Sequence, residues 1–166
     1  DAGLSMLPQK PALIVCRHTR EHIFEPKAVL EMLFEAAAPD ALFVFEVPGF
    51  DALIGRFRFD QIFHQHLQYF SLASFLRLLE NAGAHCLLHR ENYHDWGALA
   101  VAFTRIGSGK AIHRIPPRPA RPEIGRRYKL FRNQMNAASA MLAELRGTRV
   151  YGYGAAQMLP VLAYHM

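Results

Sequence analysis

The sequence predicts an α/β fold with a mixed sheet whose last strand is antiparallel, followed by the start of a second α/β domain. Apolar runs at residues 12–16 and 41–47 enclose one amphipathic segment, which is the pattern of a right-handed strand–helix–strand unit. Two further segments, residues 84–92 and 98–105, read as two strands joined by a turn around residues 94–97. A Pro- and Gly-rich segment, residues 106–122, then resembles an inter-domain linker.

The first strand–helix–strand unit has clear boundaries. ALIVC (residues 12–16) is a continuous run with β-branched residues, which is typical of a buried parallel strand. Pro26 opens a helix with one apolar face, and Pro39 stops it. ALFVFEV (residues 41–47) is then expected to form a second buried strand.

The next segment, residues 50–70, shows no clean periodicity. Ser71 has the side chain of a helix N-cap, the residues after it carry an apolar stripe, and Gly83 closes the helix.

The second half begins with a long helix that Gly147 ends. Its apolar positions alternate at spacings of four and three and form a narrow seam suited to packing against another element: Ile124, Tyr128, Phe131, Met135, Ala138, Leu142 and Leu145. TRVYGYGAA (residues 148–156) is expected to be a strand that runs into a glycine loop, and MLPVLAYHM to begin a helix. A strand–loop–helix without a following strand is half a nucleotide-binding unit, so we expect the chain to be part of a larger protein.

Composition and charge narrow the class of protein. The 166 residues are 51% hydrophobic and 20% charged, which is typical of a soluble globular protein, and no apolar run is long enough to span a membrane. The N-terminal residues do not resemble a signal peptide. Two cysteines, Cys16 and Cys86, provide no disulfide framework, so we expect free thiols and a cytoplasmic location.

Basic residues are concentrated in residues 105–132. This segment holds nine Lys or Arg against the single acid Glu123, a net charge of +8, whereas the remaining residues carry ten basic and thirteen acidic side chains, or −3. Such a strip can hold phosphates or nucleic acid, and it can equally be a solvated linker and helix face. No nucleic-acid-binding motif accompanies the charge, so we do not expect a nucleic-acid partner.

Two histidine motifs have several interpretations. His18-Thr19-Arg20-Glu21-His22 spells the inverted zinc-protease pattern, but it directly follows a strand, and Pro26 leaves little room for a metal-binding helix. His64 and His66 would face the same side of an extended segment, as metal ligands can, and either histidine could also act as a general base near neutral pH. We predict no metal at either motif, and the aromatic residues around the second could be core or site.

Four stretches together resemble a known family, the S-adenosylmethionine-dependent C-methyltransferases that act on nucleotide-linked keto-deoxysugars. ALIVCRHTREHIFEP (12–26) and PDALFVFEVPGFDALI (39–54) resemble two strands of the family and the segments that flank them. FDQIFHQHLQYFSLASF (59–75) resembles its most specific signature, Tyr-His-Glu-His-x-x-Tyr-Phe-Ser-Leu. RVYGYGAAQ (149–157) resembles the glycine loop that opens its C-terminal domain.

The resemblance implies a domain plan. Residues 1–105 would be the C-terminal half of a Rossmann-like class I methyltransferase domain, residues 106–122 a linker, and residues 123–166 the start of a second Rossmann-like domain. The family's zinc-binding cysteine cluster and its glycine-rich adenosylmethionine loop are not in this chain. We therefore expect the chain alone to bind S-adenosylmethionine poorly.

The resemblance also implies roles for individual residues. His66 matches the family's base, which removes a proton next to a sugar ketone, and His64 is a candidate donor to the enolate. The loop at Cys16, Arg17 and His18 would lie near the cofactor. The expected contacts to a nucleotide-sugar substrate are Phe63, Gln65, Gly152, Tyr153 and Gly154.

The chain departs from the family's signature at two positions. Phe63 replaces a tyrosine and Gln65 a glutamate, so a hydroxyl and a charge are lost. These changes keep open the alternative that the protein is a non-catalytic, methyltransferase-like module that binds a nucleotide-sugar or a partner. The sequence does not indicate which substrate or carbon is used, or the oligomeric state.

Overall fold

The computed structural model describes two compact units of the chain. One comprises residues 1–52 and 65–118, and the other comprises residues 53–64 and 119–166. The described residues are 6–92, 97–106, 115–117, 120–154 and 159–166. The sequence did not predict that residues 53–64 would join the second unit.

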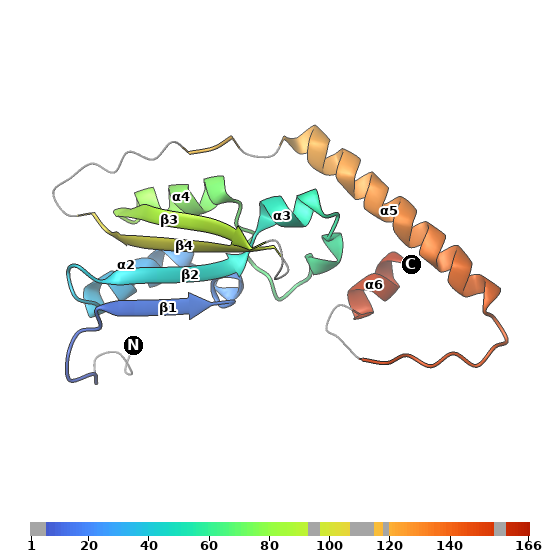
Figure 1. The fold of residues 1–166 in the computed structure, drawn as a ribbon, viewed down its shortest axis with the longest axis horizontal. Helices are drawn as coiled ribbons and strands as arrows, with labels where there is room; N and C mark the ends of the chain where they lie inside the picture. The colour runs from blue at the N-terminus through green and yellow to red at the C-terminus, as the bar shows by residue number, and fades with distance from the viewer. Residues whose placement is uncertain (1–5, 93–96, 107–114, 118–119, 155–158) are drawn as a thin grey trace. The chain divides into compact units, whose positions relative to one another are not determined.

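The first unit is built on a four-stranded mixed sheet (Figure 1). The strands are β1 (Leu13–Arg17), β2 (Leu42–Pro48), β3 (Ala84–Asn92) and β4 (Ala98–Arg105), in the spatial order β1-β2-β4-β3. β1 and β2 are parallel, whereas β4 is antiparallel to both of its neighbours. The predicted mixed sheet with an antiparallel last strand is therefore confirmed.

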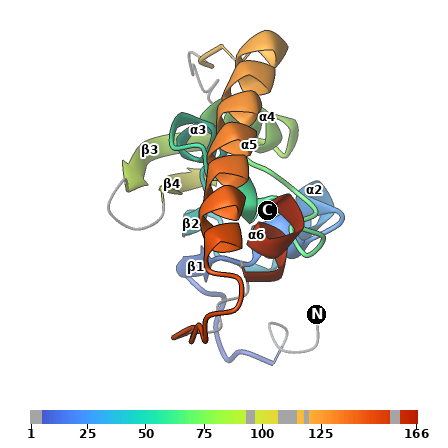
Figure 2. The same cartoon turned by 90° about the vertical axis from the view of Figure 1, so that its right-hand side faces the viewer.

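Helices α2 (Pro26–Ala36) and α4 (Leu72–Asn81) cover one face of this sheet, as both perpendicular views show (Figures 1 and 2). Leu30 and Phe34 of α2 and Leu79 of α4 are buried in the same cluster as the inward side chains of the strands. α2 begins at the proline that the sequence indicated, because proline has no amide hydrogen to lose in the first turn.

Aromatic rings fill the space between sheet and helices. Phe43 and Phe103 stack on neighbouring strands with ring centroids 5.3 Å apart, and Phe45 meets Phe103 edge-on at 4.9 Å. Phe34 and Phe75 approach the same ring of Phe103 from the two helices. Phe103 is consequently the centre of the aromatic core.

The prediction that β1 and β2 are buried strands is only partly correct. In β1 the side chains of Leu13 and Val15 are more than half exposed, while Ile14 and Cys16 pack against the core. Since successive side chains of a strand point to opposite faces, and the described helices α2 and α4 lie on one face, alternate residues are left exposed. In β2, Leu42 is likewise exposed.

Ser71 caps α4 as the sequence predicted. Its Oγ accepts a hydrogen bond from the backbone N–H of Ser74 at 3.1 Å, and the Asp51 carboxylate accepts another from the N–H of Leu72 at 2.9 Å. These two acceptors satisfy amides that the first helical turn leaves without a partner.

We expect Ser71→Ala to lower the free energy of unfolding by about 1 kcal/mol, because a first-turn amide loses its acceptor. Urea denaturation followed by circular dichroism measures the change. Glu80→Ala, at an exposed position of the same helix, is the matched control and should shift stability by less than about 0.5 kcal/mol. Equal stability of Ser71→Ala and the parent protein would contradict the capping role.

The second unit contains the long helix α5 (Arg121–Glu144) and the short helix α6 (Leu159–His165). Its aromatic contacts join Phe59 to Phe131 and Tyr128, with ring centroids 5.7 and 5.3 Å apart. Phe131 is the buried residue of the predicted seam, whereas Leu142 near the end of α5 and Leu145 just after it are exposed. The seam therefore packs only in its first half within the described residues.

The strand expected before the glycine loop is not formed. Residues 148–154 lie outside helices and strands, and Val150, Tyr151 and Tyr153 are exposed. A strand is stabilised by hydrogen bonds to a neighbouring strand, and the second unit has no other strand among its described residues to supply them. Ala155 and Ala156 of the predicted loop, and most of the turn at residues 94–97, lie outside the described residues.

Candidate active site

The candidate site lies at the carboxyl end of β1, where open α/β sheets place their ligands. The chain leaves β1 at Arg17, passes His18 and Thr19, and forms the single 3-10 turn η1 (Arg20–His22). His18 has a φ of 46°, in the left-handed region that side chains other than glycine seldom adopt. This conformation turns the chain sharply at the end of the strand.

Glu46 of β2 holds the two residues after Cys16. Its Oε1 accepts hydrogen bonds from Arg17 Nη2 and from His18 Nε2, both at 3.0 Å. The Arg17 hydrogen bond is the main reason that the pKa of Glu46 lies below its ordinary value. The backbone N–H of His18 also donates to the Glu46 carbonyl at 2.9 Å.

A second segment, residues 65–68, is held against η1 by three hydrogen bonds. The backbone amides of Leu67 and Gln68 both donate to the carbonyl of Glu21, at 2.7 and 3.0 Å. His22 Nδ1 lies 2.7 Å from the carbonyl oxygen of Gln65, and because that oxygen can only accept, Nδ1 carries the proton. These bonds join segments that are 43 residues apart in the sequence.

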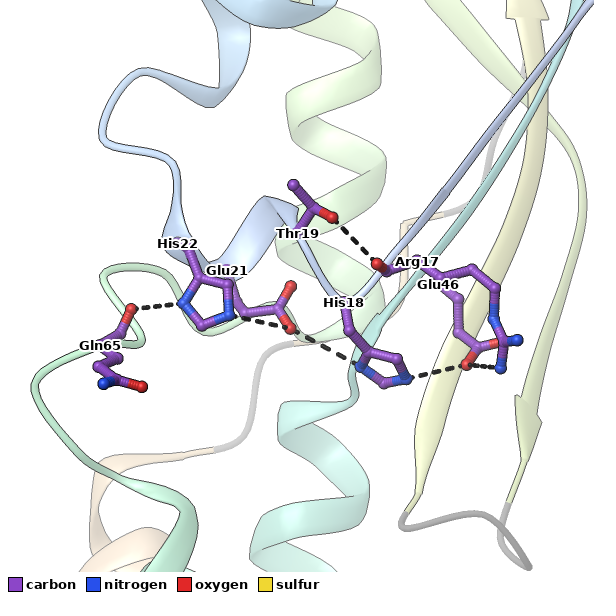
Figure 3. A network of polar contacts seen from close by, with 7 residues as sticks. All are labelled: Arg17, His18, Thr19, Glu21, His22, Glu46 and Gln65. Atoms are coloured by element: carbon purple, nitrogen blue, oxygen red, sulfur yellow. Dashed lines mark hydrogen bonds and ion pairs between the residues drawn. The ribbon is translucent and has the colours of Figure 1, made fainter. Parts of the chain in front are cut away.

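The hydrogen bonds bring His22 and His66 together, with ring centroids 5.1 Å apart. Tyr69 lies on another side of His66, at 6.0 Å between centroids. Glu21 is buried beneath the histidines, with Oε1 3.7 Å from His18 Nδ1 and 3.9 Å from His22 Nε2. Figure 3 shows the resulting row, in which imidazoles and carboxylates alternate from Gln65 to Arg17.

Arg20 is the other buried charged residue of η1. Its guanidinium lies 4.4 Å above the centre of the Phe45 ring, and within the described part of the chain none of its three side-chain nitrogens has a hydrogen-bond partner. Burial lowers the pKa of Arg20 from its ordinary value, and the neighbouring Cys16 acts in the opposite direction. The aromatic face thus provides part of the stabilisation that a buried cation requires.

The structure separates the predicted site residues into two groups. Cys16, Arg17, His18, Gln65 and His66 belong to the first unit. Arg17, His18 and Gln65 lie in the row of Figure 3, and His66 contacts His22 of that row. The second unit holds Phe63, His64, Gly152, Tyr153 and Gly154. His64 is exposed, and its ring contacts that of Phe63 with centroids 6.4 Å apart.

Two residues of the site were not predicted, Glu21 and His22. The signal was present in the sequence as the H-x-x-E-H motif, but that pattern suggested two histidines on a helix with glutamate as base. Here the motif ends in a 3-10 turn, and it is His22, not His18, that meets His66. Such a pairing across the fold cannot be read from spacing within either motif.

The first unit is an α/β domain with a histidine pair near the carboxyl end of β1, and comparison with known proteins identifies its class. Residues 3–89 match the methyltransferase domain family, so the chain belongs to that family. A curated relative, the C-methyltransferase NovU of Streptomyces niveus, is 32% identical over 159 residues, which cover 86% of this chain and 37% of NovU. The chain thus spans little more than a third of the length of that relative.

One solved structure supports the fold. A chain of the complex between the Haloferax volcanii methyltransferase activator Trm112 and a methyltransferase aligns with a TM-score of 0.50 at 12% identity, covering 64% of this chain and 60% of that one. Magnesium protoporphyrin IX methyltransferase from Synechocystis PCC 6803 aligns with a TM-score of 0.45 at 13% identity, over 62% of this chain and 48% of that one.

Proposed function

We propose that the whole protein is an S-adenosylmethionine-dependent C-methyltransferase that acts on a nucleotide-linked keto-sugar, with His66 as the general base. The observation that carries the proposal is the pairing of His22 and His66 at the carboxyl edge of β1. The 32% sequence identity to a named C-methyltransferase supports this class of reaction. No helix among the described residues is both long and apolar enough to cross a membrane, and we propose a cytoplasmic location.

The residues at the carboxyl end of β1 fit a role in holding the cofactor. The side chain of Arg17 is 65% exposed and that of His18 48%, and Glu46 fixes both of them at the edge where α/β folds bind ligands. Cys16 packs partly into the core and anchors this corner. When bound there, S-adenosylmethionine would supply an electrophilic methyl group on a sulfonium.

The proton transfer is assigned to His66. A carbon next to a ketone is acidic because the electron pair left by its proton delocalises onto the oxygen. A neutral imidazole accepts that proton on a ring nitrogen and becomes a cation. The buried carboxylate of Glu21 lies in the same cluster and favours this charge. His64 stays our proposed donor to the enolate oxygen.

The departure at Gln65 leaves one contact of the site intact. The contact from residue 65 to His22 is made by the backbone carbonyl, so it does not depend on whether the side chain is an amide or a carboxylate. The loss of charge at this position therefore does not by itself disrupt the histidine pair.

Deuterium exchange tests the base directly. In the full-length protein, with a nucleotide-linked keto-sugar in D2O and no methyl donor, we expect the acidic carbon to exchange its proton and His66→Ala to slow this exchange by about 10²–10⁴-fold. Proton NMR of the sugar provides the measurement. His89→Ala, an exposed histidine of β3, is the matched control. Unchanged exchange in His66→Ala would refute the assignment.

The residues Phe63 and Gln65 motivate a second candidate, a module that binds a nucleotide-sugar without chemistry. Calorimetry on the full-length protein distinguishes the two. Sugar-nucleotide binding without affinity for S-adenosylmethionine would favour the binding module, and binding of both would favour the enzyme.

The basic strip gives little support to a nucleic-acid substrate. Within the second unit Arg126 and Arg127 both pair with Glu123, and hydrogen bonds from these arginines lower the pKa of its carboxyl. Arg127 also donates to the Gly55 carbonyl at 3.1 Å.

We propose that residues 123–166 open a second domain, in which Gly152, Tyr153 and Gly154 contact the nucleotide-sugar.

A further inference from the structure

We propose that Glu21, His22 and His66 form a binding site for one Zn²⁺ ion. Among the described residues, these three side chains are the group whose metal-ligating atoms converge, all within 4.8 Å of one another. Two imidazoles and one carboxylate are a ligand set that zinc takes in proteins, with a fourth position left open. The site goes beyond the methyltransferase function and overlaps it at His66.

The buried carboxylate of Glu21 is the strongest argument for a cation. Only 3% of this side chain is exposed, and its Oε2 has no hydrogen-bond partner among the residues that the structure describes. Burying an ionised carboxylate without a partner is costly, and coordination to a metal is one of the ways in which proteins offset that cost. Its Oε1 lies 3.7 Å from His18 Nδ1 and 3.9 Å from His22 Nε2, distances too long for hydrogen bonds.

His22 is already prepared for coordination. Because Nδ1 donates to the carbonyl of Gln65, Nε2 holds the lone pair, and this atom lies on the side of Glu21. Histidine ligands of metals commonly donate their other ring nitrogen to a backbone carbonyl or a carboxylate, which fixes the ring and raises its basicity. The short contact at 2.7 Å supplies this support in the absence of any metal.

The backbone holds the ligands in place. Leu67 and Gln68 donate to the carbonyl of Glu21, so the segment that carries His66 is fixed to the turn that carries the other two ligands. Zinc bonds to nitrogen and oxygen are about 2.0–2.2 Å long. The ligand atoms must therefore move closer by roughly an ångström, which rotation of the half-exposed His22 ring and of the His66 ring permits.

Zinc at this site would inhibit the proposed reaction. A metal bound to His66 occupies the lone pair that would otherwise accept the substrate proton. This consequence rests on the proposed function, whereas binding of the metal does not. A direct binding measurement therefore separates failure of the zinc site from failure of the methyltransferase assignment.

Calorimetric titration of the tag-free protein with Zn²⁺, before and after treatment with a chelator, tests the site. We expect this site to bind one ion per chain, in addition to any ion held by a cysteine cluster like that of the family, and its affinity to fall by at least about tenfold in His22→Ala, His66→Ala and Glu21→Gln. Mg²⁺, which prefers oxygen ligands, should not bind there. His89→Ala, which removes an exposed histidine of β3 outside the cluster, should bind as tightly as the parent protein. Visible absorption of bound Co²⁺ reports the coordination geometry.

Each outcome of the titration either supports or overturns the zinc site. Loss of affinity in both histidine variants, with retention in His89→Ala, supports the site. Absence of Zn²⁺ binding by the parent protein, or undiminished binding by either His22→Ala or His66→Ala, overturns it. Because Glu21 is buried and its variant could unfold, circular dichroism of each variant precedes the titration, and His22→Gln replaces any alanine variant at position 22 that fails to fold.

Discussion

Replacing Phe103 by alanine is expected to lower the free energy of unfolding of the first unit by about 3–5 kcal/mol. Phe103 is 0% exposed, and its ring contacts four other phenylalanines across the sheet and from both covering helices. Truncation removes this apolar area from the core and leaves a cavity that strands on both sides prevent from closing. Such a loss is comparable to a large part of the stability of a domain.

Urea denaturation followed by tryptophan fluorescence measures this effect, because the single tryptophan, Trp96, lies between β3 and β4 in the sequence. Phe24→Ala is the matched control, since it removes the same ring from a position that is largely exposed. We expect the control to shift stability by less than about 0.5 kcal/mol. A loss below about 1 kcal/mol in Phe103→Ala would show that the ring is not central to the core.

Elements with strong local signals were predictable from the sequence. The strands at residues 84–92 and 98–105 have the predicted bounds, because Gly83 precedes the first and Gly97 separates the turn from the second. Pro26 and Ser71 locate the starts of α2 and α4, since each residue has a side chain that suits only that end of a helix. In these cases the local preference and the tertiary packing agree.

Features that depend on distant contacts could not be predicted in this way. The pairing of His22 with His66 results from hydrogen bonds between η1 and residues 65–68, and no pattern within either segment encodes them. The strand expected near residue 150 shows the opposite error, in which a local pattern predicts an element that the structure does not form. Its local composition favours a strand, but the described part of the second unit offers no neighbouring strand to pair with it.

Backbone geometry at the ends of the strands can be tested quantitatively at one position, Gly97. Gly97 directly precedes β4 with a φ of 78°, and an added Cβ would lie 2.5 Å from the Cβ of Ala52. Its carbonyl accepts the N–H of Gly49, the residue that follows β2. Both the backbone conformation and the lack of space at Gly97 thus exclude a side chain.

We expect Gly97→Ala to lower the free energy of unfolding by about 2–4 kcal/mol, from about 1–2 kcal/mol for the left-handed conformation and the remainder for the overlap with Ala52. Gly83→Ala separates the two contributions. Gly83 has a φ of 71° but no atom within 4 Å of an added Cβ, so only the conformational cost should appear. Urea denaturation of both variants gives the difference, which isolates the steric cost of the close approach between the β3–β4 turn and the segment after β2. Equal losses in the two variants would mean that Gly97 and Ala52 move apart at no cost. A larger loss in Gly97→Ala would show that the segment after β2 is held rigidly against Gly97.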